Sequence, residues 1–395
     1  MVNFEFLVPT KVVFGKDTER EAGRLIKDLG GSKVLIHWGG DYVRTTGLLD
    51  RVEQGLKDAG LSYVELDGVV PNPRLSLVKE GVQLAKQEGV DFVLAIGGGS
   101  AIDSSKAIAY GLANDFDLED LFLGKVTTDK IASLAAISTL AGTGSETSNS
   151  TVINIDTLDG PMLKRSYNHE CARPLFAIMN PELTYSLPAY QTAAPGADIM
   201  MHTMERYFTT VEHTELIDAM SEGLMRTVKT AVLEALENPN DYAARSNLLW
   251  AGSLSHNGLT GTGNVGDFAC HAIEHEIGAM FDVAHGAGLT AIWSAWAKYV
   301  LAVKPDRFAQ FGVNVFGVEN DFDDPVRTGL RGIQAWDNWC HEIGMPTSLS
   351  ELGVDPTPEQ MRQLAEGAVA ARGGALGNFR RLTADDVVAI LESAR

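Results

Sequence analysis

Residues 91–109 read DFVLAIGGGSAIDSSKAIA, and this stretch decides the fold of the first half of the chain. A compact apolar run precedes three glycines at 97–99, and helical apolar spacing follows them. The pattern predicts a buried strand, a glycine turn and the start of a helix, which is one repeating unit of a parallel α/β sheet.

The same alternation extends on both sides of this stretch. Short apolar runs typical of strands alternate with segments whose apolar residues recur every three or four positions, as in helices. Further strands are expected within 32–40, 61–73 and 130–146, and helices within 46–60, 75–89 and 100–114. The first half is therefore expected to form a parallel sheet covered by helices.

The pattern changes after NPELTYSLP at 180–188, because the segments that follow are long and helical. We therefore expect an α/β domain at 1–187 and an all-helical domain at 188–395. A chain of 395 residues is long enough for two domains.

Composition excludes several classes of protein. The formal charge is −20, from 32 basic and 52 acidic residues, which argues against nucleic-acid and anionic-membrane partners. The cysteines Cys171, Cys270 and Cys340 are odd in number and widely spaced, so a disulfide framework is not expected. The first residues do not have the pattern of a signal peptide, and no apolar stretch is long enough to span a membrane. We therefore expect a cytoplasmic protein.

The glycine turn at 97–99 is a candidate phosphate-binding loop, because glycine lets the backbone approach a phosphate at a helix N-terminus. Gly97 and Gly99 fit the first half of the G-x-G-x-x-G fingerprint, but Ile102 stands where its last glycine belongs. A tight turn without a ligand explains this stretch equally well when it is taken alone.

Two other strand ends strengthen the nucleotide interpretation. STLAGTGSE at 138–146 repeats the strand and glycine turn, and both loops are expected at the sheet edge where α/β proteins bind ligands. IHWGGDYVR at 36–44 places Asp41 after another strand, where an acid accepts the ribose hydroxyls of NAD. Asp41 as a simple helix N-cap is the alternative.

HAIEHEIGAMFDVAHGAG at 271–288 raises the question of a metal site. Its first five letters match the H-x-x-E-H pattern of inverted zinc peptidases, in which His271 and His275 bind zinc and Glu274 acts as the base. MFDVA resembles a break between two helices, so His285 is expected to begin the second helix.

A second metal-ligand spacing occurs in GADIMMHTMERYF at 196–208. Asp198 and His202 lie one helical turn apart in an apolar segment, where a cation would offset the cost of burying them. Together with His271 and His285 they form a donor set suited to Fe(II) or Zn(II), and His275 then faces the same cavity without binding the metal. Scattered core histidines are the alternative, and we interpret the remaining histidines in that way, as surface or core residues: His37, His169, His213, His256 and His341.

With these motifs in view, the chain resembles the iron-containing, or group III, alcohol dehydrogenases over almost its whole length. The resemblance lies in PNPR, AIGGGSAIDSSKAIA, STLAGTGSE, NPELTYSLP, DIMMHTMERYF and HAIEHEIGAMFDVAHGAGL, and the tail NFRRLTADDVVAILESAR is most similar to the butanol dehydrogenase and aldehyde reductase branch. It implies a dinucleotide-binding α/β domain, an all-helical metal-binding and substrate domain as in dehydroquinate synthase, and a homodimer or larger homo-oligomer.

The resemblance also implies roles for single residues. Metal ligation is carried over to Asp198, His202, His271 and His285, and His275 is expected near the nicotinamide and substrate as a proton relay. Cofactor contacts are carried over to Asn72, Gly97, Gly98, Gly99, Ser100, Asp103, Thr139, Leu140, Thr143, Lys164 and Leu183. Many members of this branch have GGGS where this chain has GGDY, and a carboxylate at Asp41 repels the 2′-phosphate of NADP(H), so NAD(H) is favoured.

The expected reaction is reversible hydride transfer between a primary alcohol and its aldehyde, with Fe(II) or Zn(II) as a Lewis acid at the substrate oxygen. An NAD- and metal-dependent lyase similar to dehydroquinate synthase is the nearest rival. Such a lyase needs several basic side chains around an anionic substrate, and the metal-bearing stretches offer only Arg206. The peptidase hypothesis leaves both glycine loops unexplained, and a protein that only binds a ligand would not need the complete donor set.

Overall fold

The computed structural model describes residues 1–156 and 162–395. The chain forms two compact units, one of Leu7–Leu187 and the other of Met1–Phe6 with Pro188–Arg395. The first six residues were expected in the α/β unit but belong to the helical one. The backbone explains this placement, because the amide of Val2 donates a hydrogen bond to the carbonyl of Gly263 (2.9 Å).

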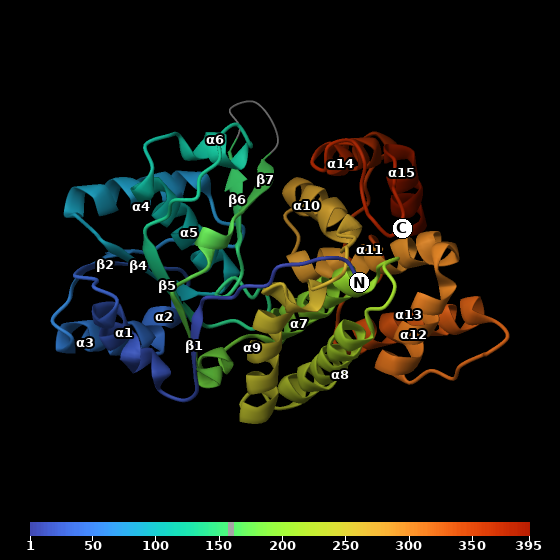
Figure 1. Cartoon of the computed structure of the whole chain (residues 1–395), viewed down its shortest axis with the longest axis horizontal. Coiled ribbons are helices and arrows are strands. Elements are labelled where there is room, and N and C mark those ends of the chain that lie inside the picture. Colours follow the sequence, from blue (N-terminus) through green and yellow to red (C-terminus); the bar gives the residue numbers. More distant parts are fainter. Residues whose placement is uncertain (157–161) are drawn as a thin grey trace. The chain divides into compact units, whose positions relative to one another are not determined.

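A six-stranded sheet forms the centre of the α/β unit, and all of its strand pairs are parallel (Figure 1). The strand order is β1-β8-β5-β4-β2-β3. The strands are β1 (Lys11–Phe14), β2 (Lys33–Trp38), β3 (Ser62–Leu66), β4 (Phe92–Gly97), β5 (Ser133–Ser138) and β8 (Phe176–Met179). The glycine stretch quoted first therefore does follow a central buried strand.

Helices cover both faces of this sheet (Figure 1). Along β2, Val34 and Ile36 pack with α1 and α3, whereas Leu35 faces the opposite side and packs with α4, α5 and α6. The bounds are α1 (Ala22–Asp28), α2 (Tyr42–Thr45), α3 (Leu48–Asp58), α4 (Leu75–Glu88), α5 (Gly99–Ala113) and α6 (Leu118–Phe122). Burial on both faces explains why the strands are continuous apolar runs rather than alternating ones.

The strand order identifies the edge where a ligand is expected. From β2 the chain first forms β3 on one side and then β4 on the other side, which is the 2-1-3-4-5 order of doubly wound sheets. The switch point lies between the carboxyl ends of β2 and β4, where residues 39–41 and 97–99 follow their strands. This order differs from the Rossmann order, in agreement with the incomplete G-x-G-x-x-G fingerprint.

A small antiparallel hairpin of β6 (Ser150–Ile155) and β7 (Leu163–Asn168) completes the α/β unit. It adjoins the main sheet's helices through α5, because the amide of Val152 donates to the carboxylate of Asp103 (2.9 Å). The loop around Asn72 adjoins the same hairpin, since the amide of Asn154 donates to the carbonyl of Pro73 (2.8 Å).

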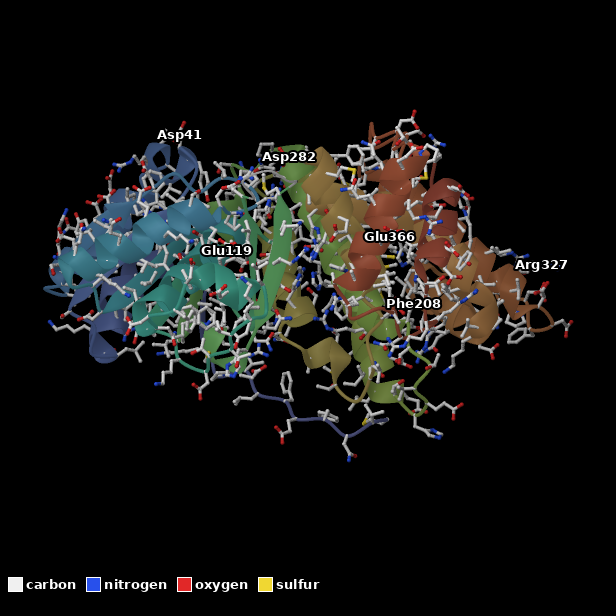
Figure 2. All side chains as sticks on the ribbon, turned by 90° about the horizontal axis from the view of Figure 1, so that it is seen from above. Asp41, Glu119, Phe208, Asp282, Arg327 and Glu366 are labelled. Atoms are coloured by element: carbon white, nitrogen blue, oxygen red, sulfur yellow. The ribbon has the colours of Figure 1, made fainter. Side chains whose placement is uncertain are left out.

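The second unit is helical, as expected from the long apolar periodicity after residue 189. Its core includes a cluster of aromatic rings around Phe208, which stacks on Phe308 and contacts Trp293 and Trp296 (Figure 2). The helices are α7 (Ala189–Tyr207), α8 (Glu215–Glu237), α9 (Tyr242–His256), α10 (Ala269–Phe281), α11 (His285–Val300), α12 (Pro305–Phe311), α13 (Pro325–Glu342), α14 (Pro358–Ala370) and α15 (Ala384–Ser393). Within the described parts of the chain, no helix combines the length and hydropathy needed to cross a membrane.

Candidate active site

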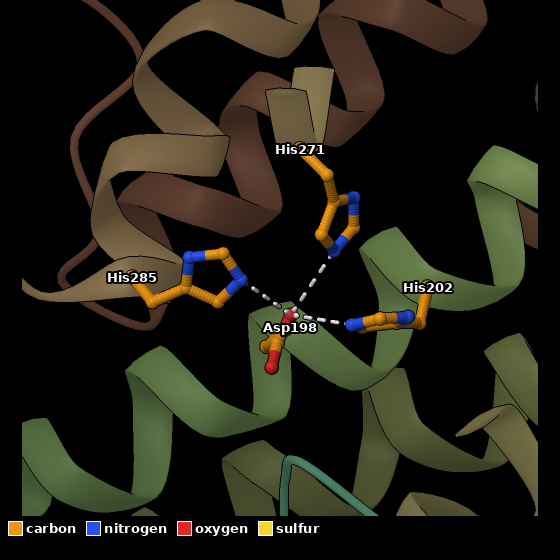
Figure 3. A group of neighbouring side chains, drawn as sticks. All are labelled: Asp198, His202, His271 and His285. Atoms are coloured by element: carbon orange, nitrogen blue, oxygen red, sulfur yellow. Dashed lines mark ion pairs between the residues drawn. The ribbon is translucent and has the colours of Figure 1, made fainter. Parts of the chain in front are cut away.

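Four side chains from three helices meet inside the helical unit (Figure 3). The Nε2 atoms of His202, His271 and His285 lie 3.6, 3.6 and 3.7 Å from the same oxygen, Oδ1 of Asp198. One donor atom from each of the four residues lies within 4.8 Å of the other three. The structure therefore brings together all four residues that the sequence analysis proposed as metal ligands.

The spacing of these atoms fits a shared cation better than direct hydrogen bonds. Distances of 3.6–3.7 Å exceed hydrogen-bond length. They are close to the separation of about 3.4 Å between neighbouring ligands around a tetrahedral ion with bonds of about 2.1 Å. Among the described residues, neither Oδ1 of Asp198 nor Nε2 of His271 has a hydrogen-bond partner, although both atoms are buried. One carboxylate and three imidazoles form a donor set that Fe(II) and Zn(II) accept.

The electrostatics of the cluster keep its carboxylate ionised. Burial alone would raise the pKa of Asp198, but His285, His271 and His256 outweigh this effect and hold the pKa at about 2. Burial would likewise lower the pKa of His271, whereas the facing carboxylates of Asp198 and Glu205 raise it to about 9. The carboxylate of Asp198 is therefore ionised at all ordinary pH values.

The helices place these side chains for local reasons. Asp198 and His202 are four residues apart on α7, so they project from one face of that helix. The helix that carries His271 ends at Phe281, because Asp282 adopts a left-handed conformation (φ 52°) and breaks the chain direction. His285 then begins α11, as the sequence predicted.

Glycine is required immediately after His285. A Cβ atom on Gly286 would lie 1.9 Å from the carbonyl oxygen of Ala194, so α11 and α7 approach each other with backbone in direct contact. This contact holds the helix that begins with His285 against the helix that carries Asp198. The small residues of HGAG therefore allow a close approach between two chain segments.

We expect Gly286→Ala to destabilise the protein by about 1–3 kcal/mol or more, because backbone atoms cannot move aside for the added methyl group. The measurement is urea-induced unfolding followed by circular dichroism. Gly223→Ala in α8 is the matched control, since a Cβ there meets only the end of the Arg226 side chain at 3.8 Å and alanine favours the helix. Equal stability of both variants would contradict the close-approach explanation.

Three residues at the cluster were not identified from the sequence. His256, which we had interpreted as a surface or core residue, has a side chain only 6% exposed, and its Nε2 atom lies 3.9 Å from Oδ2 of Asp198. Glu205 faces Nδ1 of His271 at 3.6 Å, and the ring of Phe268 lies against His202 and His271. The spacing of Asp198, His202 and Glu205 on one helix face could have identified Glu205. No periodic signal connects His256 with α7.

The structure does not support the peptidase interpretation of H-A-I-E-H. His275 lies outside the group around Asp198, with its ring centroid 5.6 Å from that of His285. Glu274, which would be the peptidase base, is fully buried and forms an ion pair with Nδ1 of His285. His271 and His275 therefore do not form one zinc site in which Glu274 is the catalytic base.

The guanidinium of Arg206 is bound by neighbouring residues of the helical unit. The Nη1 atom donates to the carbonyl of His202 (2.6 Å), and the guanidinium lies over the ring of Phe268, 4.9 Å from the ring centroid. Because this guanidinium is already engaged, it does not provide the free basic surface that an anionic lyase substrate needs. This placement weakens the lyase alternative.

In the α/β unit, the two glycine loops pack directly on each other. A Cβ on Gly98 would lie 3.1 Å from Cβ of Leu140, and a Cβ on Gly99 would lie 2.5 Å from Oγ1 of Thr143. These glycines therefore serve the contact between loops in addition to any contact with a ligand. α5 begins at Gly99 without a side-chain cap, which leaves the amides of its first turn, including Ser100, for a phosphate.

The residues that follow β2 contact the second glycine loop. The hydroxyl groups of Tyr42 and Thr139 are 2.7 Å apart and share a hydrogen bond. Asp41 occupies the N-cap position of α2, but its side chain forms no capping hydrogen bond. Its side chain is exposed at the surface of the unit (Figure 2). Helix capping alone therefore does not explain Asp41.

The other residues carried over as cofactor contacts have different surroundings. Both carboxylate oxygens of Asp103 accept hydrogen bonds from the protein, one from the hydroxyl of Ser145 and one from the amide of Val152. Asp103 thus ties the second glycine loop and the hairpin to α5, and its contact with the cofactor stays a prediction. Lys164 lies on β7 of this hairpin, and Leu183 lies in the 3-10 turn Pro181–Thr184 and packs against the sheet core.

Comparison with known proteins connects both units to one family. The family model described as "Iron-containing alcohol dehydrogenase" matches residues 9–181, and the model for the C-terminal part of the same family matches residues 192–395. NADH-dependent butanol dehydrogenase A of Clostridium acetobutylicum is 38% identical, with 100% of each chain covered. The NADPH-dependent aldehyde reductase YqhD of Escherichia coli is 31% identical, also with 100% of each chain covered.

A solved structure shows the same fold. The crystal structure of NADH-dependent butanol dehydrogenase A from Thermotoga maritima matches with a TM-score of 0.94 and 36% identity, covering 99% of this chain and 98% of that one. The chain therefore belongs to the iron-containing alcohol dehydrogenase family, in the branch of butanol dehydrogenases and aldehyde reductases, and is an NAD(P)-linked alcohol oxidoreductase.

Proposed function

We propose that the protein catalyses reversible hydride transfer between a primary alcohol and its aldehyde, with a divalent metal held by Asp198, His202, His271 and His285 and with NAD(H) as the favoured cofactor. The observation that carries this proposal is the convergence of three imidazole Nε2 atoms on Oδ1 of Asp198. Among relatives, butanol dehydrogenase A is described as NADH-dependent and YqhD as NADPH-dependent, so the family alone does not decide the cofactor.

The donor set supports either Fe(II) or Zn(II) as the metal. When bound, such a cation supplies Lewis-acid chemistry at the substrate oxygen. The protein contributes a preformed site, because Asp198 and His271 are almost fully buried and α11 packs against both of the helices that carry them, α7 and α10. Metal analysis of the purified protein identifies which ion it holds.

The α/β unit supplies the cofactor site in this proposal. The free amides at the start of α5 receive the pyrophosphate charge, and the second glycine loop holds the first one in position through Leu140 and Thr143. Lys164 belongs to the hairpin that adjoins α5, and the loop around Asn72 adjoins the same hairpin. We assign these residues to cofactor binding on the basis of their position at or beside the carboxyl edge of the sheet.

Selectivity for NAD(H) is assigned to the end of β2. In this proposal the carboxylate of Asp41 lies beside the position of the 2′-phosphate of NADP(H) and repels its two negative charges. The nearest cation in sequence, Arg44, is engaged with Glu65 (2.7 Å) and lies over the ring of Trp38, so it is not directed at a phosphate. Charge repulsion without a compensating cation favours the cofactor that lacks the phosphate.

We expect Asp41→Asn to raise the ratio of kcat/KM for NADPH to that for NADH by about thirtyfold. Removing the charge relieves a repulsion of about 2 kcal/mol with a phosphate dianion, taking roughly 1 kcal/mol for each pair of charges near water. Steady-state kinetics with both cofactors provide the measurement, and Asp28→Asn, an exposed acid on the same unit, is the control. An unchanged ratio would remove Asp41 from the cofactor site.

The proposed function itself is tested by NADH oxidation with butanal and longer and shorter aldehydes, in the presence and absence of a chelator. We expect NADH-dependent reduction that is lost on chelation and restored by Fe(II) or Zn(II). Activity that survives complete metal removal would overturn the proposed role of the cluster around Asp198. Preferential use of NADPH would overturn the cofactor assignment but not the reaction.

A further inference from the structure

Two buried carboxylates lie behind the histidines of the metal cluster, on the side away from Asp198. Glu205 belongs to α7 and Glu274 to α10, and their side chains are 3% and 0% exposed. Buried carboxylates are costly unless charge or hydrogen bonds compensate them, so their positions require an explanation. Neither residue belongs to the four-residue donor set.

Glu274 contacts His285 on the nitrogen opposite the cluster. Its Oε2 atom forms an ion pair with Nδ1, whereas Nε2 of the same ring lies 3.7 Å from Oδ1 of Asp198. An ionised carboxylate can only accept a hydrogen bond, so Nδ1 carries the proton. In the neutral ring, Nε2 then presents its lone pair to the position that a metal would occupy.

Glu205 faces the corresponding nitrogen of His271, Nδ1, at a longer distance. Its Oε1 atom lies 3.6 Å from Nδ1 of His271, and the Nε2 atom of that ring faces Asp198 at 3.6 Å. The same Oε1 accepts a hydrogen bond from the amide of Cys270 (3.0 Å), which fixes the carboxylate beside the ring. Each of these two histidines therefore has a buried carboxylate on its Nδ1 side, and Glu274 is the one within hydrogen-bond distance.

The third histidine has no such carboxylate among the described residues. Nδ1 of His202 lies 3.4 Å from a nitrogen of Arg206, and its ring lies against His256 with centroids 3.5 Å apart. A guanidinium has no acceptor atom for the Nδ1 proton, unlike a carboxylate. The three imidazoles are therefore not equivalent.

The helix packing leaves room for Glu274. A Cβ on Gly288 would lie 2.8 Å from Cγ and 3.3 Å from Oε1 of Glu274, so the glycine on α11 allows this carboxylate to reach His285. α10, which carries Glu274, has a non-glycine residue in the left-handed region at each end, Phe268 at φ 56° and Asp282 at φ 52°. Strained residues at both ends are a cost that function can justify.

We propose that Glu274 and Glu205 are positioning residues for metal binding: Glu274 fixes the Nδ1–H tautomer and the orientation of His285 through a hydrogen bond, and Glu205 makes a weaker, electrostatic contribution beside Nδ1 of His271. The proposal rests on the metal site of the proposed function. Carboxylates behind metal-binding histidines orient the ring and increase its basicity as a ligand. The glutamate of H-A-I-E-H thus acquires a role that differs from that of a peptidase base.

The test is the affinity of the folded apoprotein for Zn(II), measured by competition with a coloured chelator. We expect Glu274→Gln to weaken binding by about ten- to a hundredfold and Glu205→Gln by less, because glutamine keeps the shape but loses the charge that holds the Nδ1 proton. Gly288→Ala should act in the same direction, since it displaces Glu274 without removing its carboxylate. Circular dichroism verifies that each variant is folded.

Glu222→Gln is the matched control, because Glu222 is a buried carboxylate of the same unit that binds Tyr207, Gln310 and Asn314 instead of a histidine. The absorption spectrum of the Co(II)-loaded protein gives a second readout, which should change for Glu274→Gln and stay constant for Glu222→Gln. Asp198→Asn reports on the site itself. If it abolishes binding while both Glu274→Gln and Glu205→Gln bind like the original protein, the positioning role is refuted and the metal site stands. If Asp198→Asn also binds normally, the site is refuted as well.

Discussion

Replacing Asp198 by asparagine is expected to abolish stoichiometric metal binding and to lower kcat/KM for aldehyde reduction by at least about a thousandfold. The carboxylate is the point on which three imidazoles converge, and its oxygen Oδ1 has no other partner among the described residues. Metal-ion catalysis contributes several kcal/mol to the stabilisation of the transition state, and about 4 kcal/mol corresponds to a thousandfold.

Asparagine isolates the charge from the shape of the side chain. Because the pKa of Asp198 is about 2, the carboxylate is ionised wherever the protein is assayed, and the substitution removes a full charge. Metal content by elemental analysis and NADH oxidation with butanal are the two measurements. Asp337→Asn is a suitable control, since Asp337 is a buried acid of the same unit that accepts a hydrogen bond from Ser294. Full metal occupancy in Asp198→Asn would contradict the ligand assignment.

The sequence predicted the four donor residues because local spacing carried most of the information. Asp198 and His202 lie one helical turn apart, and the break at MFDVA separates His271 from His285 in both sequence and structure. Helix periodicity determines which side chains share a face of one helix. The combination of residues from three helices into one set was predicted from the residue types and was supported by the family resemblance, because spacing within a helix says nothing about packing between helices.

The residues that were missed depend on that packing. His256 ends α9 and reaches Asp198 only because α7 and α9 pack together. The contacts of Asp103 also depend on packing, because its two carboxylate oxygens accept hydrogen bonds from the second glycine loop and from the hairpin, more than forty residues away in sequence. Likewise, backbone hydrogen bonds rather than composition place Met1–Phe6 with the helical unit. Contacts between distant segments leave no periodic trace in a single sequence.

Replacing His275 by alanine should separate proton transfer from metal binding. His275 follows His271 by one turn on α10 and lies beside His285, yet it is not one of the residues that converge on Asp198. A histidine in this position can hold and move a proton near neutral pH. We therefore expect kcat to fall by about a hundred- to ten-thousandfold, which is the usual contribution of a positioned general acid or base, while the metal content stays unchanged.

Two measurements make this expectation specific. Metal analysis distinguishes a lost ligand from a lost proton relay. Added imidazole should restore part of the activity, because it replaces the missing group without rebuilding the helix. His213→Ala is the matched control, since His213 belongs to the same unit and its side chain is 84% exposed. Loss of the metal from His275→Ala would show that His275 is a ligand in addition to Asp198, His202, His271 and His285. An unchanged kcat would show that the proton moves through another group.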